Sequence, residues 1–346
     1  PGILNTLQGM ACSYYDSVPG LYLSGAPVRS ALRKNKHIRQ IGFQEMDVDD
    51  ITKSFTKYSV RIMNPDNIIY EIEKACHIAK SGRPGPVLID LPDDLQRSEV
   101  DEKTQKRYLI NKKKSKINSN KFDQFSKLLN KSKRPLVIFG NGIKLAKAES
   151  LALKLIKKYK IPYSATWAVH DTFKHDDKYN AGSFGVYATR YGNFAIENSD
   201  LLIILGSRLN GTLTGSSRKN FSPKSKKIQV DIDINEINIG NNFNLDLKIV
   251  GDVKEFLENI LENKTKYKSN DNWLNKITTW KKKYPILIDE FKSQGKNVNP
   301  YYFFDTLSDM TLKDDIIIPD ASANLVWTYQ AYKNQRKQKI FTALNH

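Results

Sequence analysis

Short apolar runs of strand length recur along the chain, with segments of helical spacing between them. Residues 87–91, 135–139 and 201–205 are almost entirely apolar, and a glycine directly follows the second and the third run. Runs of this kind are typical of strands in parallel sheets, because helices cover both faces of such sheets. The alternation of these runs with helical segments predicts an α/β fold of doubly wound parallel-sheet domains.

The helix expected over residues 66–81 shows how the other elements were assigned. Its apolar residues follow helical spacing, Asn64 is a suitable N-cap, and Pro65 stands in the first turn. The glycine- and proline-rich residues 82–86 end this helix before the next strand. The same criteria predict further strands over 20–25, 161–165, 227–233 and 316–320, and further helices over 146–158, 252–260 and 300–310.

Residues 97–120 are polar and basic and lack periodicity, which is typical of a linker between domains. We therefore expect a first domain over residues 1–100, a linker over 101–120 and a second domain over 121–265. Residues 266–346 then form another linker and the start of a third domain. This last segment is too short to bury a complete parallel sheet, and the chain begins with proline rather than methionine. We expect a fragment cut at both ends.

Composition excludes several classes of protein. A content of 40% hydrophobic and 10% aromatic residues is too high for a disordered chain, and two cysteines are too few for a disulfide scaffold. No apolar run approaches the roughly 18 residues of a membrane span, and no secretory signal opens the chain. The net charge of +18 comes mainly from dispersed lysines, and the densest cluster, residues 112–116, contains no aromatic residue. We expect a cytoplasmic protein that binds neither membranes nor nucleic acid.

Polar residues and glycines stand at or after the ends of the expected strands, where doubly wound sheets bind their ligands. Asp90, Gly140 and Gly206 are examples, and Arg208 follows closely. Gly140 and Gly142 form either a tight turn or a phosphate contact, and the third glycine of a dinucleotide fingerprint is missing. Arg208 is either a phosphate ligand or an ordinary surface arginine.

The five histidines are scattered, so no metal-ligand cluster is visible in the sequence. His170 and His175 have four residues between them, and this His-x4-His pattern suggests a metal pair if the segment is helical. The residues around them lack helical character, and we expect no metal site there.

Several short motifs follow one another in an order that is specific as a set, although each motif alone is modest. They are residues 1–5 (PGILN), 16–19 (DSVP), 42–45 (GFQE), 82–87 (GRPGPV), 90–92 (DLP), 182–185 (GSFG), 205–208 (LGSR), 230–233 (VDID) and 320–330 (DASANLVWTYQ). This series resembles the thiamine-diphosphate-dependent enzymes, and in particular the large catalytic subunit of acetolactate synthase. The resemblance extends over essentially the whole chain.

The resemblance implies a three-domain architecture with pyrimidine-binding, central and diphosphate-binding domains, here truncated at both ends. It implies thiamine diphosphate and Mg²⁺ as cofactors, decarboxylation of a 2-oxo acid, and addition of the product to a second carbonyl. Because the family holds its cofactor between two subunits, it also implies a homo-oligomer that is at least a dimer. The alternatives are a 2-oxo acid or oxalyl-type decarboxylase without carboligation, and a non-catalytic nucleotide-binding module.

Site residues follow from the resemblance only where the motifs match. Phe43 and Gln44 match residues that line the active site. The cofactor-binding positions are Pro1, Asn5, Gln44, Ser322, Ala323 and Asn324. The positions that surround a flavin in acetolactate synthases are Arg83, Gly140, Gly142, Gly206 and Arg208.

The chain also departs from the family pattern. The catalytic glutamate and the Gly-Asp-Gly…Asn metal motif would lie outside residues 1–346, so we expect no metal ligand and no catalysis in this stretch alone. Asp93 replaces a family lysine, which inverts a charge near the active-site entrance and puts the usual substrate in question. Residues 209–212 read Leu-Asn-Gly-Thr in place of Phe-Asp-Asp-Arg, which leaves flavin binding open.

Overall fold

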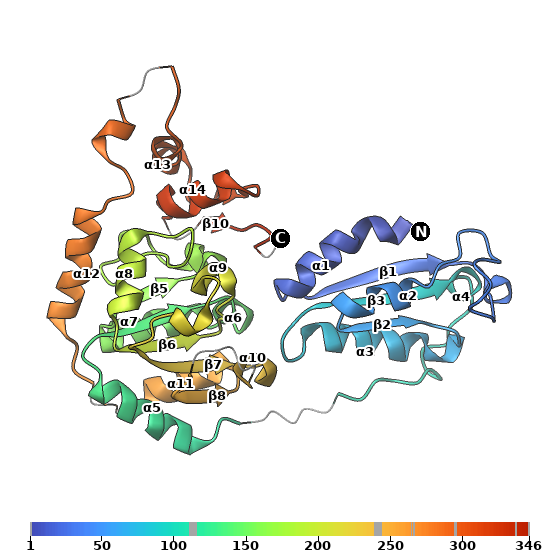
Figure 1. Cartoon of the computed structure of the whole chain (residues 1–346). Helices are drawn as coiled ribbons and strands as arrows, with labels where there is room; N and C mark the ends of the chain where they lie inside the picture. The colour runs from blue at the N-terminus through green and yellow to red at the C-terminus, as the bar shows by residue number, and fades with distance from the viewer. Residues whose placement is uncertain are drawn as a thin grey trace. The chain divides into compact units, whose positions relative to one another are not determined.

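The computed structural model divides into two compact units, Pro1–Lys114 with Ala343–His346, and Ser115–Thr342 (Figure 1). The structure describes residues 2–110, 116–238, 244–263, 265, 267–293, 296–335 and 338–344. Each unit is described by itself below.

The first unit is built on a parallel sheet of three strands. The strands are β1 (Gly20–Ala26), β2 (Tyr58–Arg61) and β3 (Pro86–Pro92), in the spatial order β1-β3-β2. One face of the sheet packs on α3 (Ile68–Lys80), and the other packs on α1 (Leu7–Tyr15) through Met10 and Leu88.

Local interactions define the ends of the helical segment formed by η4 (Pro65–Asn67) and α3. The side chain of Asn64 accepts a hydrogen bond from the Asp66 amide at the start of the helical segment, so the predicted N-cap is confirmed. At the other end, the Lys57 ammonium donates to the carbonyl of Ser81 at 2.6 Å. A cation at a helix C-terminus satisfies unpaired carbonyls and complements the helix dipole. The remaining elements of this unit are η1 (Gly2–Thr6), η2 (Arg29–Ala31), α2 (Val48–Thr52), η3 (Lys53–Phe55), η4 (Pro65–Asn67) and α4 (Asp93–Gln96).

The second unit is built on a parallel sheet of five strands in the order β5-β4-β6-β7-β8. Side chains of β4 alternate between two cores, with Leu136 and Ile138 in one and Val137 and Phe139 in the other. This alternation follows from the pleat, which turns successive side chains to opposite faces. The strands are β4 (Pro135–Phe139), β5 (Tyr163–Ala165), β6 (Leu201–Leu205), β7 (Lys226–Asp231) and β8 (Leu247–Val250).

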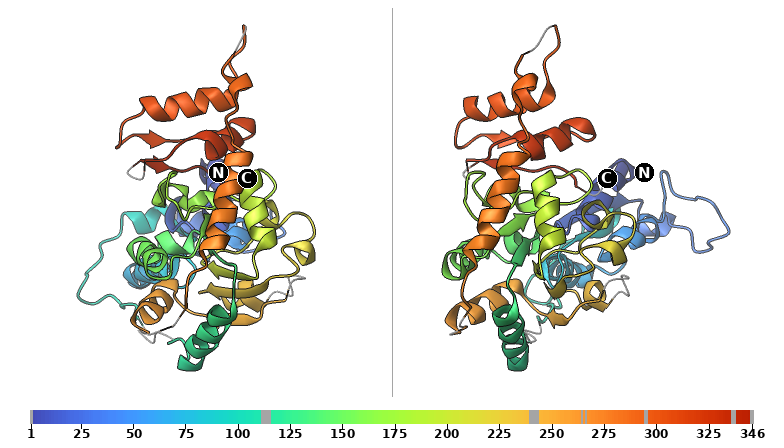
Figure 2. Two further views of the ribbon diagram at one scale, coloured as in Figure 1. Left: turned by 90° about the vertical axis from the view of Figure 1, so that its left-hand side faces the viewer. Right: turned by 60° about the vertical axis from the view of Figure 1, so that its left-hand side comes forward.

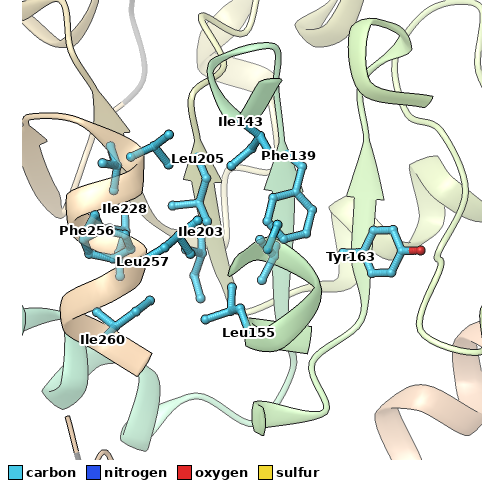
Figure 3. Packing of buried hydrophobic residues seen from close by; sticks show 14 of the residues in the cluster. Phe139, Ile143, Leu155, Tyr163, Ile203, Leu205, Ile228, Phe256, Leu257 and Ile260 are labelled. Carbon is cyan, nitrogen blue, oxygen red and sulfur yellow. The ribbon is translucent and has the colours of Figure 1, made fainter. Parts of the chain in front are cut away.

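Helices cover both faces of this sheet. One core contains residues of α5 (Ser119–Lys131), α7 (Glu149–Tyr159) and α11 (Val253–Glu262), and Figure 3 shows part of it. The other core contains residues of α8 (Arg190–Asn198) and α12 (Asp271–Lys283). The predicted doubly wound parallel sheet is confirmed. Shorter helices of this unit are α6 (Gly142–Leu145), η5 (Trp167–Thr172), α9 (Gly211–Thr214), η6 (Arg218–Asn220), α10 (Ile234–Asn238) and η7 (Asp289–Phe291).

The last part of the second unit pairs two helices with a very small sheet. The helices α13 (Pro300–Met310) and α14 (Ala323–Ala331) lie side by side, as Figure 2 shows from two directions. The strands β9 (Ile316–Ile317) and β10 (Lys339–Ile340) pair in parallel.

Several predicted elements differ from the observed ones. The helix expected over 146–158 begins at Glu149, because Lys147 adopts a left-handed conformation (φ 53°) between α6 and α7. The strand expected over 316–320 ends at Ile317. No sequence pattern predicted the strands β2, β8 and β10 or the longer helices α1, α5, α8, α12 and α14. Within the described residues, no helix is both long enough and apolar enough to cross a membrane.

Candidate functional site

The strands of the first unit are parallel, so their carboxyl ends meet at one end of the sheet. These ends are Ala26 of β1, Arg61 of β2 and Pro92 of β3. The segment that leaves β1, residues 27–47, is here called the carboxyl-end loop. It contains the predicted site residues Phe43 and Gln44.

A buried ion pair fastens the carboxyl-end loop to the strands. The Asp90 side chain is only 1% exposed, and its carboxylate lies 2.6 Å from Nε of Arg61. The same guanidinium donates to the carbonyl of Met46 and lies 3.6 Å from the Asp47 carboxylate. Arg61 therefore joins β2, β3 and the end of the loop.

A second charged pair fastens the beginning of the loop. The Asp94 carboxylate accepts a hydrogen bond from the Arg29 amide at 2.9 Å and from Arg29 Nε at 2.6 Å. The Arg29 guanidinium also donates to the carbonyl of Met63 at 2.9 Å. These contacts, together with those of Arg61, hold both ends of the loop at the carboxyl end of the sheet.

Glu45 organises the loop from inside. One of its carboxylate oxygens accepts the Arg33 amide at 2.7 Å, and the other accepts the amides of Ile41 and Gly42 at 2.9 and 3.1 Å. Burial raises the pKa of Glu45, but the three amide hydrogen bonds outweigh this effect and leave the pKa below its usual value. Glu45 is therefore an ionised carboxylate within the loop.

Phe43 and Gln44 are the residues that the loop presents to solvent. The Phe43 side chain is 87% exposed, and Gln44 is also exposed. Gln44 adopts a left-handed backbone conformation (φ 59°), which is uncommon outside glycine and asparagine. No residue in the described part of the chain hydrogen-bonds to the Gln44 side-chain amide. An uncommitted amide beside an exposed aromatic ring can bind a polar ligand that also has an apolar part.

The other predicted residues of this unit lie at different places. Asn5 is exposed in η1, whose Ile3 packs in the same cluster as Met46 of the loop. Arg83 precedes β3, at the opposite end of the sheet from Gln44, and its Nε donates to Ser17 Oγ at 2.8 Å. Because β3 has seven residues, about 20 Å of strand separates the two ends. Pro1 is outside the described residues.

In the second unit, three predicted glycines come together at the carboxyl end of the sheet. The Gly142 amide donates to the Gly206 carbonyl at 2.9 Å, and the Gly140 amide donates to the Leu205 carbonyl at 2.9 Å. A Cβ atom added to Gly142 would lie 2.6 Å from Cα of Gly206. The amides of Gly140 and Gly142 thus donate to backbone carbonyls at and just after the end of β6. This geometry favours the tight-turn interpretation of Gly140 and Gly142.

Arg208 lies in a strained segment that other residues hold. The next residue, Leu209, is buried in a left-handed conformation with φ 51°. The Arg218 guanidinium donates to the carbonyls of Leu209 and Arg208 at 2.6 and 3.3 Å, and burial lowers its pKa. The Gln229 amide donates to the Ser207 carbonyl at 3.2 Å. No sequence pattern marks Arg218 or Gln229 as a support of this segment.

Ser322, Ala323 and Asn324 lie together at the start of α14. Ser322 is exposed and strained, with φ 72° and ψ −145°, and Ala323 is the first residue of the helix. Oδ1 of Asn324 is buried and has no hydrogen-bond partner among the described residues. The helix is fixed to η5 by Tyr329, whose ring stacks on Trp167 at a centroid distance of 5.0 Å.

The histidines expected to lack a metal role lie beside this helix. The His170 ring contacts Tyr329, and desolvation lowers the pKa of His170 to about 4. Asn334 supports the segment by donating to the carbonyls of His170 and Phe173 at 3.1 and 2.9 Å. Over the described ranges, no group of three or more histidine, cysteine, aspartate and glutamate side chains is placed to hold a metal ion.

Comparison with known proteins matches one segment to a family model and nearly the whole chain to curated relatives. Residues 122–260, from α5 to α11, match the central domain of thiamine pyrophosphate enzymes. The chain is 30% identical over 352 residues to the acetolactate synthase large subunit of Porphyra purpurea, and 32% identical over 356 residues to the probable acetolactate synthase large subunit of Methanocaldococcus jannaschii. Each alignment covers 99% of this chain and 58% of the relative. The chloroplastic acetolactate synthase of Arabidopsis thaliana is 30% identical, with 98% of this chain and 50% of the relative covered.

The chain thus spans little more than half the length of these relatives. Its parallel α/β architecture and the position of the matched central domain agree with the motif order in the sequence. The chain carries a match to the central domain of thiamine pyrophosphate enzymes, and it is similar to acetolactate synthase large subunits along nearly its whole length.

Proposed function

We propose that the protein carrying residues 1–346 decarboxylates a 2-oxo acid with thiamine diphosphate and joins the product to a second carbonyl. The observation that carries this proposal is the alignment of 99% of the chain with acetolactate synthase large subunits. The exposed Phe43 and Gln44 at the carboxyl end of a parallel sheet support it, because ligands of such sheets bind at that end.

The domain roles are part of this proposal. Residues 1–100 serve as part of the pyrimidine-binding domain, 101–120 as a linker, and 121–265 as the central domain. Residues 266–346 serve as a second linker and the start of the diphosphate-binding domain. The match of residues 122–260 to the family's central domain supports the middle assignment.

Thiamine diphosphate suits the polar groups that the described residues leave uncommitted. Within the described ranges, the side-chain amides of Asn5 and Gln44 have no hydrogen-bond partner, and neither does Oδ1 of Asn324. When bound, the cofactor supplies the nucleophile and the electron sink. Gln44 would donate to or accept from a polar atom of cofactor or substrate, and the Phe43 ring would shield the reacting groups from water.

Mg²⁺ and flavin are supported less well by the described residues. No three carboxylate, histidine or cysteine side chains of the described chain converge on one point. The amides of Gly140, Gly142 and Gly206 already donate to backbone carbonyls, so the flavin candidates with charged side chains are Arg83 and Arg208. We therefore assign no step to either group.

The proposal includes a small-molecule 2-oxo acid as substrate, a homo-oligomer that is at least a dimer, and a cytoplasmic location. Sedimentation of the complete protein tests the oligomer, and a monomer under assay conditions would contradict that part. The relatives' names support the substrate class only at about 30% identity.

Product analysis of the complete protein tests the reaction. It is incubated with thiamine diphosphate, Mg²⁺ and ¹³C-labelled pyruvate, and the products are identified by NMR. Acetolactate is the expected product. Acetaldehyde alone would indicate the decarboxylase alternative. Absence of any product, together with calorimetric binding of flavin or adenine nucleotide but not thiamine diphosphate, would indicate the nucleotide-binding alternative.

A further inference from the structure

Glu45 lies next to the exposed pair Phe43 and Gln44 but is itself only 4% exposed. Its carboxylate accepts hydrogen bonds from three backbone amides of its own loop. We propose that Glu45 is a positioning residue that holds Phe43 and Gln44 in the conformation in which they meet the ligand. This inference rests on the proposed function of those two residues.

The hydrogen bonds of Glu45 close a turn around the two site residues. Its own amide donates to the Gly42 carbonyl at 3.1 Å, which makes Gly42–Glu45 a four-residue turn with Phe43 and Gln44 in the middle. Its carboxylate accepts the Gly42 amide and the Ile41 amide from the same side of the turn. The Gln40 side chain donates to the Glu45 carbonyl at 3.2 Å.

The same carboxylate links this turn to the first part of the carboxyl-end loop. The amide of Arg33 donates to it at 2.7 Å, and Arg33 follows the short helix η2. Because the carboxylate accepts amides from Arg33 and from Ile41 and Gly42, it fixes the distance between the first part of the loop and the turn. The turn alone would not fix this distance.

The backbone conformation of Gln44 shows why such a restraint is needed. A left-handed conformation is unfavourable for a non-glycine residue, so the surroundings of Gln44 must stabilise it. Gly42 adds a second constraint, since a Cβ atom there would lie 2.9 Å from the Ala31 carbonyl. The turn is thus packed closely on one side and held by Glu45 on the other.

Amides, rather than an ion pair, account for the contacts of Glu45. The guanidinium of Arg33 pairs with Asp47 and donates to the Arg39 carbonyl at 2.8 Å. A neutral glutamine of the same shape would therefore not simply lose an ion pair. Its NH₂ group would face at least one of the three amide N–H groups, and that donor would be left without an acceptor.

Hydrogen exchange of the complete protein tests the positioning directly. We expect Glu45→Gln to accelerate amide exchange in peptides covering residues 38–47 at least tenfold and to leave α3 unchanged. Glu99→Gln is the matched control, because it makes the same chemical change at an exposed residue. Unchanged exchange in the loop, or an equal increase throughout the unit, would overturn the proposal.

A double-mutant cycle tests whether Glu45 acts through Gln44. Thiamine diphosphate affinity is measured by calorimetry for Gln44→Ala, Glu45→Gln and the double variant. If Glu45 acts through Gln44, both single variants bind more weakly and the double variant is within about twofold of the weaker one. Single effects that multiply would overturn the coupling of the two residues. Faster loop exchange with unchanged affinity in all variants would instead overturn the ligand role that the proposed function gives to Gln44.

Discussion

The two parallel sheets of this chain differ in how their faces are covered and in how their carboxyl ends are closed. In the second unit, β4 and β6 are buried along their whole length between two layers of helices. In the first unit, the side chains of Leu21 and Leu23 in β1 are 40% and 65% exposed. Their paired residues in β3, Val87 and Ile89, are buried against α3. Apolar packing therefore covers both faces of the second sheet, whereas part of one face of the first sheet is left exposed.

The carboxyl ends show the same contrast. In the second unit, Gly142 and Gly206 bring two backbones into direct contact and use their own polar groups. In the first unit, Arg61, Asp90 and Glu45 hold a long loop that keeps Phe43 and Gln44 exposed. The glycine contacts use backbone groups to pack two segments together, while the charge-anchored loop presents side chains to solvent.

The largest expected difference concerns the apolar cores. Phe256 is fully buried in α11 and contacts Phe125 at a centroid distance of 5.2 Å, so Phe256→Ala should lower the free energy of unfolding by about 3–5 kcal/mol. Leu23→Ala in the first unit should change it by less than about 0.5 kcal/mol, because this side chain is mostly exposed. Urea denaturation measures both. Equal losses in the free energy of unfolding would show that Leu23 is buried as fully as Phe256.

The buried ion pair should matter almost as much. Asp90→Ala leaves the Arg61 guanidinium buried without its main partner, and such losses reduce stability by about 3–5 kcal/mol. Asp93→Ala is the control, since its pair with Arg97 is largely exposed and should contribute less than about 1 kcal/mol. Urea denaturation with a probe in the first unit measures the two variants. If both variants unfold alike, polar anchoring is not what stabilises this unit.

A pH dependence is expected in the second unit. Folding lowers the pKa of His170 from 6.5 to about 4, so the unfolded chain binds more protons between these values. The resulting stability is complete above pH 6.5 and falls as the pH is lowered towards 4, by at most about 3 kcal/mol. Urea denaturation at several pH values measures this loss, and His170→Phe should reduce the slope. An unchanged slope in this variant would assign the effect to other groups.

The smallest expected effect concerns the glycine contact. Gly206→Ala adds a Cβ atom 2.7 Å from Cα of Gly142 at a residue with φ 64°, and it should destabilise the second unit by about 1–3 kcal/mol. Gly211→Ala adds a Cβ atom to open space and serves as the control. Thermal unfolding compares the two. A tolerated alanine at position 206 would mean that the two backbones can separate.

The sequence predicted the fully buried strands well and missed one edge strand in each sheet, β2 and β8, for a physical reason. The runs at 135–139 and 201–205 are buried on both faces, and they coincide with β4 and β6. By contrast, β2 (Tyr58–Arg61) is short and carries serine and arginine, so no apolar run marks it. Strands that depend on polar contacts leave a weaker pattern in the sequence.

The candidate site also left little pattern in the sequence. Phe43 and Gln44 were predicted from family resemblance, since neither periodicity nor spacing indicates an exposed pair on a loop. Asp90 was recognised as a polar residue at a strand end, but its partner Arg61 lies 29 residues away. The role of Glu45 was not predictable, because its partners are backbone amides, which every sequence contains.

Titration of the complete protein with thiamine diphosphate in the presence of Mg²⁺ tests the central claim most directly. We expect saturable binding, weakened at least fivefold by Gln44→Ala, because one hydrogen bond to the ligand contributes about 1 kcal/mol. Gln124→Ala in α5 is the control, and it should bind as the unaltered protein does. Absence of saturable binding, or equal affinity in the protein with and without Gln44, would contradict the account.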